Sequence, residues 1–267
     1  MMNATSHVKL EYTNLAHGGR VARLQLNRPD QANAFSGEMM TEIAAHLSGL
    51  SGLSDVRVLV ISGLGKHFSA GADLNWMKSS AALSFEENLK DAAQLKDMFE
   101  SIVNLPIPKI AVVQGAVYGG AVGIVACCDY AIANTGTKFC LSEAKLGLVP
   151  AVIGPYLLRK IRQGSLKRLA LTAQVFMAPE AKEAGLVEIV TDNTDEALKN
   201  ELNALLACGP NAQIAINKLF ESLRKNAFAQ GKETIEAIAK ARTSAEGQAG
   251  LSSFFAKSTP PWVRSLD

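Results

Sequence analysis

The sequence predicts an α/β fold in which buried strands alternate with helices and a helical section follows. Short segments rich in β-branched residues alternate with segments of helical apolar spacing through about the first 190 residues. After residue 194 almost all of the apolar spacing is helical. We therefore expect two parts, a core over residues 1–195 and a helical region over residues 196–267.

Composition excludes several classes of protein. With 267 residues, of which 48% are hydrophobic and 19% charged, the chain is long enough to bury a large core. Its net charge of +2 is scattered, which argues against a nucleic-acid partner. The longest apolar run, residues 116–128, is too short to cross a bilayer, and the first residues lack a targeting pattern, so we expect a cytoplasmic protein with no membrane partner.

The cysteine pattern argues against a zinc site or a disulfide framework. Four cysteines are present, without C-x-x-C spacing, and two of them are adjacent. No two histidines form a ligand pair, so no metal is expected. We expect reduced thiols, with the adjacent pair as small core residues. The four are Cys127, Cys128, Cys140 and Cys208.

The first elements are a hairpin, a helix and a buried strand. Residues 7–15 and 20–27 alternate in polarity around a glycine-containing turn, which predicts two antiparallel strands. Ser36 is a suitable N-cap for a helix over residues 37–50. Residues 56–62 are nearly all apolar, which predicts a strand buried on both faces.

The middle of the chain continues the alternation. Ser84 and Glu87 form the sequence of a capping box for a helix that ends at the "LPIP" segment after residue 103. Residues 109–115 predict another buried strand, and residues 116–130 predict a helix. Strand-like pieces follow up to residue 142, and beyond residue 151 helices dominate except at residues 185–190.

Two loops join a strand to a helix through glycines, at residues 63–72 and 115–120. In α/β folds such loops carry the functional groups. The second contains Gly119 and Gly120 but neither G-x-G-x-x-G nor a phosphate-loop lysine, which argues against nucleotide binding. A helix start with free N–H groups suits an oxyanion hole. The alternative is that the glycines only permit a tight corner.

The first glycine loop offers a second backbone donor. In "HFSAGAD", Gly71 lies between two alanines, so the amide of Ala72 can be reached from outside. Asp73 can cap a short helix beginning near Leu74. By itself this pattern is better explained by an ordinary loop with a helix cap.

Taken together, the two loops resemble the crotonase (enoyl-CoA hydratase/isomerase) family. Five segments follow one another in the order and spacing of that family: "FSAGADLNWM", "VQGAVYGGAVGIVACCDYAIA", "FCLSEAKLGLVPAVIGPYLLRKI", "APEAKEAGLVEIV" and "SSFFAKSTPPW". The resemblance implies a spiral of ββα units with a C-terminal helical trimerisation region, assembled as a homotrimer or homohexamer. The residues of the first and third segments are most similar to those of bacterial hydratases of branched, carboxylated enoyl-CoAs, such as methylglutaconyl-CoA or carboxygeranoyl-CoA.

The resemblance also implies roles for particular residues. The N–H groups of Ala72 and Gly120 would bind the thioester oxygen and stabilise the enolate that forms. Coenzyme A would enter only as part of the substrate, with no separate cofactor. The residues that would bind it are Gln31, Ala32, Ala70 and Lys257, the last for a CoA phosphate and from the same or a neighbouring subunit.

The acid–base groups depart from the family pattern. Family hydratases use two glutamates, because one group must activate water and one must protonate the α-carbon. The second position is Glu143 here, whereas the first is Gly123, which has no side chain. The apolar residues around Glu143 in sequence predict a pKa raised by burial. They are Leu141, Leu146, Leu148 and Val149.

Three hypotheses follow from the missing acid. Glu143 could carry out both proton transfers of a hydration, or it could shuttle one proton in a Δ3,Δ2-enoyl-CoA isomerase. The chain could also be a CoA-thioester binding protein without catalysis. Trp76 and Tyr118 are candidates for the acyl pocket, where core packing is the alternative for both. Arg159 is a weaker candidate that could meet an anionic acyl end.

Overall fold

The computed structural model describes residues 6–264 except 17, 81–82, 226–239 and 241–243. A six-stranded sheet has the order β1-β2-β3-β4-β6-β9, and a three-stranded sheet has the order β5-β7-β8. In the larger sheet only β1 and β2 are antiparallel; the other neighbours are parallel. The strands are β1 Val8–Asn14, β2 Arg20–Leu26, β3 Val56–Gly63, β4 Lys109–Val113, β5 Ala116–Tyr118, β6 Tyr130–Asn134, β7 Lys138–Cys140, β8 Phe176–Met177 and β9 Ile189–Thr191.

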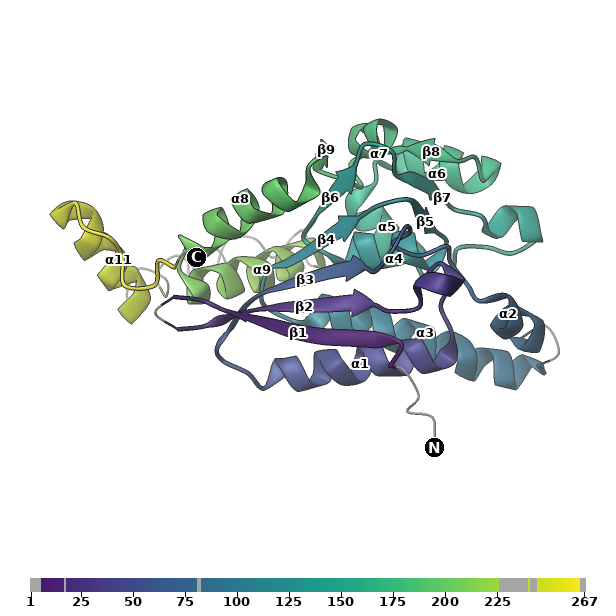
Figure 1. The fold of residues 1–267 in the computed structure, drawn as a ribbon, viewed down its shortest axis with the longest axis horizontal. Coiled ribbons are helices and arrows are strands. Elements are labelled where there is room, and N and C mark those ends of the chain that lie inside the picture. Colours follow the sequence, from purple (N-terminus) through teal and green to yellow (C-terminus); the bar gives the residue numbers. More distant parts are fainter. Residues whose placement is uncertain (1–5, 17, 81–82, 226–239, 241–243, 265–267) are drawn as a thin grey trace.

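Helices cover both faces of the larger sheet (Figure 1), which confirms the predicted α/β class. Helices α1 and α3 lie against one face and α8 against the other. The α-helices are α1 Gly37–Ser51, α2 Leu74–Ser80, α3 Phe85–Asn104, α4 Gly120–Cys127, α5 Gly154–Lys160, α6 Gln163–Thr172, α7 Ala178–Ala184, α8 Thr194–Leu206, α9 Pro210–Lys225 and α11 Ala245–Ala256. Two short 3₁₀ helices are η1 Pro29–Gln31 and η2 Glu143–Leu146.

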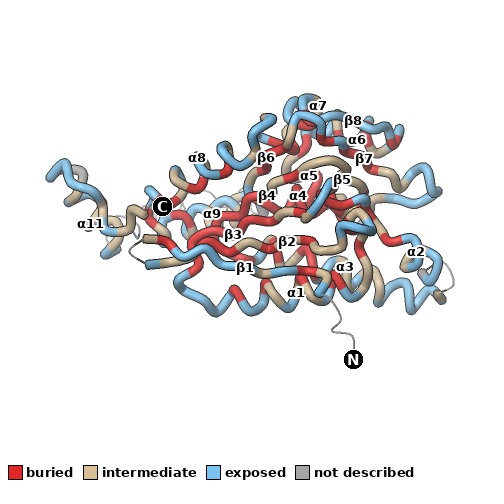
Figure 2. The backbone as a smooth tube through the Cα atoms, viewed as in Figure 1, coloured by how far each residue is buried: buried red, intermediate tan, exposed pale blue. Residues whose placement is uncertain are grey.

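Strand β3 shows why a nearly continuous apolar run is needed in the middle of this fold. Successive side chains of a strand point to opposite faces of the sheet. Leu59 and Ile61 belong to the core under α1 and α3, whereas Val58 and Val60 pack against α8. Figure 2 shows the buried backbone of β3 between these helical layers. The prediction of a strand buried on both faces is confirmed.

The predicted helix starts are confirmed where a capping side chain defines them. The Ser36 hydroxyl accepts a hydrogen bond from the Met39 N–H at 3.2 Å, at the start of α1. At α3, the Glu87 N–H donates to the Ser84 hydroxyl and the Ser84 N–H donates to the Glu87 carboxylate. These bonds satisfy N–H groups that have no partner inside the helix.

One sequence prediction was wrong in its bounds. Residues 116–118 form strand β5, which pairs with β7, and the helix begins only at Gly120. The cause is Gly119, whose φ of 52° and ψ of −120° end the strand without continuing into a helix. The predicted break in the helices at residues 185–190 is confirmed: Gly185, with φ of 92°, ends α7, and a turn precedes strand β9, which begins at Ile189.

The C-terminal part is attached to the sheet at its far end. Helix α8 packs on the sheet through Leu198, Leu202 and Leu206. The Arg57 guanidinium on β3 donates to the Cys208 carbonyl oxygen at 2.9 Å and to that of Trp262 at 3.2 Å. Helix α11 lies at the end of the molecule opposite α2 (Figure 1). The predicted helix over residues 232–244 falls almost entirely outside the described residues.

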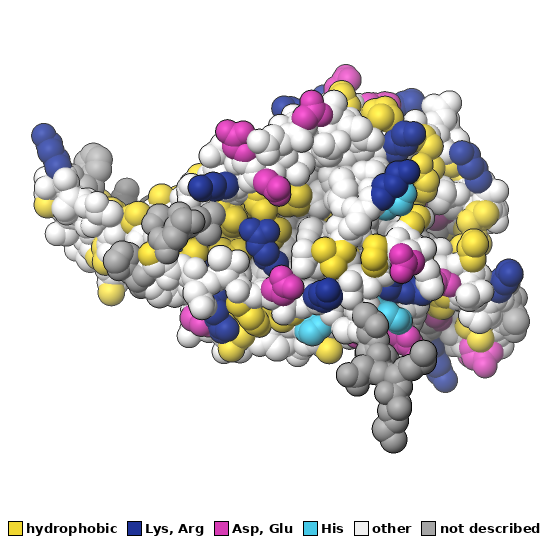
Figure 3. All heavy atoms as spheres, in the orientation of Figure 1, with side chains coloured by type: hydrophobic (Ala, Val, Ile, Leu, Met, Phe, Trp, Pro, Cys, Tyr) yellow, Lys and Arg dark blue, Asp and Glu magenta, His cyan; other side chains and the backbone are white. Residues whose placement is uncertain are grey.

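The scattered surface charge and the free thiols agree with what the sequence predicts. In the space-filling view, charged side chains of both signs are scattered over the visible face (Figure 3). The adjacent cysteines and Cys140 are buried and Cys208 is exposed, all as free thiols, which confirms the first two as core residues. No helix within the described residues is long and apolar enough to cross a membrane.

Candidate active site

Two parallel segments bring the two glycine loops together beyond the end of the sheet. The Ser69 N–H donates to the Ala116 carbonyl oxygen at 3.0 Å, and the Tyr118 N–H donates to the Ser69 carbonyl oxygen at 3.1 Å. In this register Ser69 lies opposite Val117. Ala72 comes three residues after Ser69, and Gly120 comes three residues after Val117. The two therefore lie at the same level on adjacent segments.

The amides at this level are free. The Phe35 N–H donates to the Gly71 carbonyl oxygen and the Asp73 N–H donates to that of Phe35, so the Ala72 N–H faces away from Phe35. Neither the Ala72 N–H nor the Gly120 N–H has an acceptor among the described residues. Both residues are partly exposed, so a ligand oxygen can reach them. Two free, neighbouring N–H groups are the requirement of an oxyanion hole.

A left-handed glycine precedes each free amide. Gly71 has a φ of 97° and Gly119 a φ of 52°. A Cβ at Gly71 would also lie 3.1 Å from the Tyr118 carbonyl oxygen. Residues with a side chain are strained at such angles, so both positions require glycine. The glycines therefore do more than form one tight corner, since they turn two separate segments at the same level.

The Glu143 side chain lies beside this pair. Glu143 begins η2 after β7, and its Oε1 atom is 3.7 Å from where a Cβ on Gly119 would be. Its Oε2 atom is buried and has no hydrogen-bond partner among the described residues. Burial raises the pKa of Glu143 above that of an exposed carboxyl. A protonated acid at this place can donate a proton, and its carboxylate can accept one.

The burial of Glu143 does not come from most of the residues predicted to cause it. Leu146, Leu148 and Val149 are 55%, 58% and 74% exposed. Of the predicted apolar neighbours only Leu141 is buried. The carboxyl is enclosed instead where it meets Gly119 at the start of α4, a contact between parts of the chain far apart in sequence.

Gly123 lies one turn into α4, in a place that is already full. A Cβ there would be 2.6 Å from Ile153 Cγ2 and 2.9 Å from Phe99 Cε1 and Cζ. Phe99 and Ile153 are both buried, at 0% and 3% exposure. The sequence interpretation missed these two residues. Only their apolar character was visible, and nothing local indicated that they meet at Gly123.

The structure brings together three of the predicted CoA-binding residues. The Ala70 N–H donates to the Ala32 carbonyl oxygen at 2.9 Å, and Gln31 is adjacent and exposed. The Arg28 guanidinium contacts Gln31 and also donates to the Asp73 carboxylate at 3.0 Å. This arginine, which the sequence interpretation also missed, links the predicted CoA loop to the loop that carries Ala72.

Asp73 explains how that loop is held. Its carboxylate accepts from the N–H groups of Asn75 and Trp76, at 2.8 and 3.3 Å, and so caps α2 as predicted. Burial opposes its ionisation, but these N–H groups and Arg28 together lower the pKa of Asp73. The carboxylate is therefore charged at neutral pH and fixes the backbone next to Ala72.

The other predicted residues lie in different places. Trp76 on α2 is half-buried, and its indole N–H donates to Asp91 of α3 at 3.0 Å. Tyr118 is half-buried, and burial raises its pKa. Lys257 directly follows α11, at the opposite end of the molecule from α2 (Figure 1). One chain does not bring it to Ala32 and Ala70.

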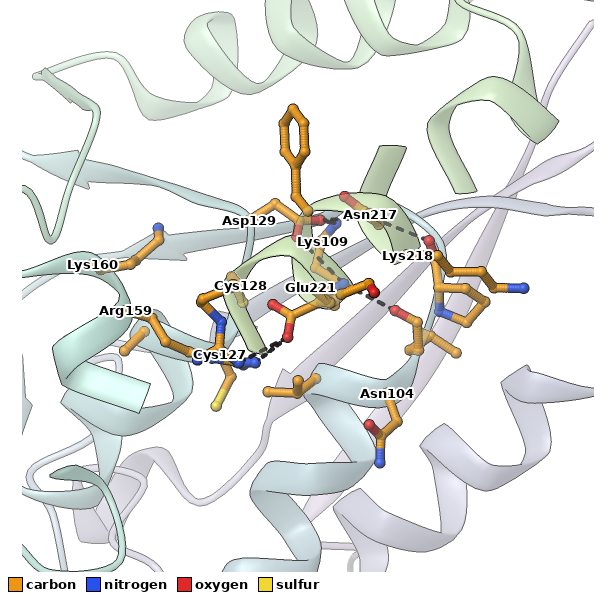
Figure 4. A pocket seen from close by; sticks show the side chains of 17 residues that line it. Asn104, Lys109, Cys127, Cys128, Asp129, Arg159, Lys160, Asn217, Lys218 and Glu221 are labelled. Carbon is orange, nitrogen blue, oxygen red and sulfur yellow. Dashed lines mark hydrogen bonds and ion pairs between the residues drawn. The ribbon is translucent and has the colours of Figure 1, made fainter. Parts of the chain in front are cut away.

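A cavity of about 570 Å³ lies between α3 and the segment that leads into α5. Its wall includes Val152, the neighbour of Ile153, and Arg159. A charged cavity of about 700 Å³ shares Arg159 with it, on the side of α9 (Figure 4). Arg159 and Arg224 line both cavities, and Glu221, which pairs with both arginines, lines the larger one.

Comparison with known proteins agrees with this arrangement. A family model described as "Enoyl-CoA hydratase/isomerase" matches residues 17–265. An enoyl-CoA hydratase from Shewanella pealeana has a solved structure with 41% identity and a TM-score of 0.89, covering 95% of each chain. Enoyl-CoA hydratase ACTT6 from Alternaria alternata is 32% identical over 78% of this chain and 70% of that protein. A peroxisomal Delta(3,5)-Delta(2,4)-dienoyl-CoA isomerase from Arabidopsis thaliana is 30% identical over 73% of this chain and 74% of that one.

A helix-covered parallel sheet with two free amides beside a buried carboxyl defines an α/β protein built to hold a polarised carbonyl oxygen. The chain belongs to the enoyl-CoA hydratase/isomerase (crotonase) family. It is an enzyme of the hydratase/isomerase type that acts on enoyl-CoA thioesters.

Proposed function

We propose that this enzyme adds water across the double bond of a 2-enoyl-CoA, with Glu143 as the single acid–base group. The thioester oxygen accepts hydrogen bonds from the N–H groups of Ala72 and Gly120. The Glu143 carboxylate takes a proton from water as the water oxygen bonds to the β-carbon. The proton then passes to the α-carbon, so that H and OH are added and Glu143 is regenerated.

One observation carries this proposal: the Glu143 carboxyl, whose buried Oε2 atom has no partner among the described residues, lies beside Gly119, directly before the free amide of Gly120. A buried carboxyl without a partner is costly to the fold, which favours a role for it with a ligand. Its raised pKa suits a group that must both accept and donate a proton near neutral pH. The resemblance to carboxygeranoyl-CoA and methylglutaconyl-CoA hydratases supports a branched, carboxylated acyl group.

A Δ3,Δ2-enoyl-CoA isomerase is the second candidate. It is favoured by the filled space around Gly123, where Phe99 and Ile153 leave no room for a second acid. An isomerase needs only one group that moves a proton between two carbons, and no activated water. A CoA-thioester binding protein without catalysis is the third and weakest hypothesis, because the free amides and Glu143 are all in place.

The test follows both reactions with the same protein. Loss of the 2-enoyl thioester absorbance reports hydration, and its gain from a 3-enoyl substrate reports isomerisation. Product formed in H₂¹⁸O carries ¹⁸O if water is added; a turning-over enzyme whose product lacks the label is not a hydratase. Glu143→Gln is expected to lower kcat by about 10²–10⁴-fold. Glu180→Gln, a surface residue paired with Arg168, is the matched control and should retain activity.

Several further predictions belong to this proposal. We propose that Gln31, Ala32 and Ala70 line the CoA adenine site, and that Lys257 meets a CoA phosphate from a neighbouring subunit. Trp76 and Tyr118 would lie along the acyl group. Assembly as a trimer or hexamer through residues 196–267, location in the cytoplasm, and catalysis without a metal remain predictions as well.

A further inference from the structure

The cavity between α3 and α5 changes character along its length. On α3 its lining residues pass from apolar to charged in chain order: Leu89, Ala92, Ala93, Lys96 and Glu100. On the segment leading into α5 and on α5 itself they do the same: Ala151, Val152, Pro155, Tyr156 and Arg159. The apolar end of the second series adjoins Ile153, which contacts the position of Gly123 in α4.

Tyr156, in the second series, packs against Phe99 of α3 and lies near both Glu100 and Arg159. The rings of Phe99 and Tyr156 are 5.4 Å apart, and the Arg159 guanidinium carbon is 5.8 Å from the centre of the Tyr156 ring. Burial, with the charge of Glu100 nearby, raises the pKa of Tyr156 to about 12. The hydroxyl therefore keeps its proton and can donate a hydrogen bond to a ligand at this end.

Two guanidinium groups at this end share a single carboxylate. The Lys96 ammonium and the Glu100 carboxylate neutralise each other at 2.6 Å. The Glu221 carboxylate on α9 is shared by two guanidinium groups, that of Arg159 and that of Arg224, the latter at 3.0 Å. Figure 4 shows Arg159 and Glu221 pointing toward one another. One carboxylate cannot balance two arginines, because both stay charged at any relevant pH.

The Arg159 side chain is also largely withdrawn from water, with 15% of it exposed, while Arg224 is exposed. A guanidinium forms two parallel hydrogen bonds to a carboxylate, and such bonds are stronger where water is excluded. The cavity thus combines an apolar half, which adjoins Ile153 beside α4, with an arginine-lined end near the end of α5.

We propose that Arg159 and Arg224 bind a carboxylate at the distal end of the acyl chain, and so select dicarboxylic acyl-CoA substrates. This inference rests on the proposed function, since it takes the acyl group to enter the cavity from the side of Glu143. The incoming carboxylate shares the two arginines with Glu221, and the Tyr156 hydroxyl donates to it. Glu221 holds the arginines in place when the site is empty, and it competes with the substrate for them.

The test uses titration calorimetry to compare the binding of two CoA thioesters, hexanoyl-CoA and adipoyl-CoA. Both acyl chains have six carbons and no double bond to hydrate, and only adipoyl-CoA ends in a carboxylate. The wild-type enzyme should bind adipoyl-CoA more tightly. Arg224→Gln should weaken adipoyl-CoA binding about tenfold and leave hexanoyl-CoA binding within twofold. Glu221→Gln should strengthen adipoyl-CoA binding, because it removes the competing charge. A folding defect would weaken both esters in both variants, so these opposite directions separate recognition from damage.

Arg168→Gln is the matched control, because Arg168 pairs with Glu180 on the surface. It should change neither affinity. The inference is overturned if Arg224→Gln changes both esters equally or neither, or if Glu221→Gln weakens adipoyl-CoA binding. These measurements need no turnover. Failure of the proposed function shows separately, as absence of water addition to 2-hexenoyl-CoA and 2-hexenedioyl-CoA by the wild-type enzyme.

Discussion

A methyl group added at residue 123 is expected to destabilise this protein, although alanine is the better helix former. Gly123 lies inside α4, where replacing glycine by alanine in open space gains about 0.8–1.0 kcal/mol. Here the new Cβ would lie 2.6 Å from Ile153 Cγ2 and 2.9 Å from two ring atoms of Phe99. Overpacking of a core costs about 1–3 kcal/mol, and contacts this short favour the upper part of that range.

The net expectation for Gly123→Ala is a loss of about 1–2 kcal/mol of unfolding free energy, or about 2–8 °C in Tm for a chain of this size. Gly49→Ala is the matched control, because Gly49 lies inside α1 with no atom within 4 Å of its added Cβ. It should raise the unfolding free energy by about 0.5–1 kcal/mol. Denaturant unfolding and calorimetry measure both variants.

A double-mutant cycle identifies the cause. Ile153→Ala removes the Cγ2 atom that the new methyl group would meet, so Gly123→Ala should be less harmful in that background. The reasoning is refuted if Gly123→Ala alone is as stable as the wild type, or if the two substitutions add without coupling. Gly123→Glu, which restores the acid of the family pattern, should destabilise the protein further and should not raise hydration.

The remaining predictions concern Glu143, Gly119 and Ser84. Because burial raises the folded-state pKa of Glu143, the charged carboxyl costs stability as pH rises from the unfolded-state value through the folded-state value. Glu143→Gln should therefore raise Tm at pH 8 and not at pH 4; equal shifts at both would contradict this. Gly119→Ala places a side chain at φ of 52° and should lower the unfolding free energy by about 1–3 kcal/mol. It should also lower kcat while leaving KM nearly unchanged, as steady-state kinetics would show. Ser84→Ala removes the capping box of α3 and should cost about 1 kcal/mol in denaturant unfolding, whereas no loss would show the cap to be dispensable.

Features that depend on neighbouring residues could be predicted from the sequence. The capping residues Ser36 and Ser84 mark helix starts because a hydroxyl bonds to an N–H three residues later. Strand β3 was visible because both of its faces are covered, which leaves an unbroken apolar run. Strand β5 was not, since three residues are too few to show a period of two beside a longer apolar helix.

The active site also has a part that the sequence predicts and a part that depends on contacts between distant segments. The glycines and Glu143 stand in recognisable motifs, so the resemblance gave their places in the chain. The causes of their environment are contacts between distant segments. Glu143 is enclosed at Gly119 and not by the exposed apolar residues that follow it at positions 146, 148 and 149, and Gly123 is constrained by a ring from α3. The position of Lys257 depends on where α11 lies, which no local pattern determines.

The free amides of residues 72 and 120 belong to the main chain, and the pairing of two segments sets their level. Replacement of nearby side chains leaves the chemistry of these donors unchanged as long as that pairing survives. A lineage of such proteins can therefore exchange its acids, or lose one, while it continues to polarise the same thioester. Redesign of the reaction on this scaffold should begin with side chains that face the cavity and should leave the two glycine turns untouched.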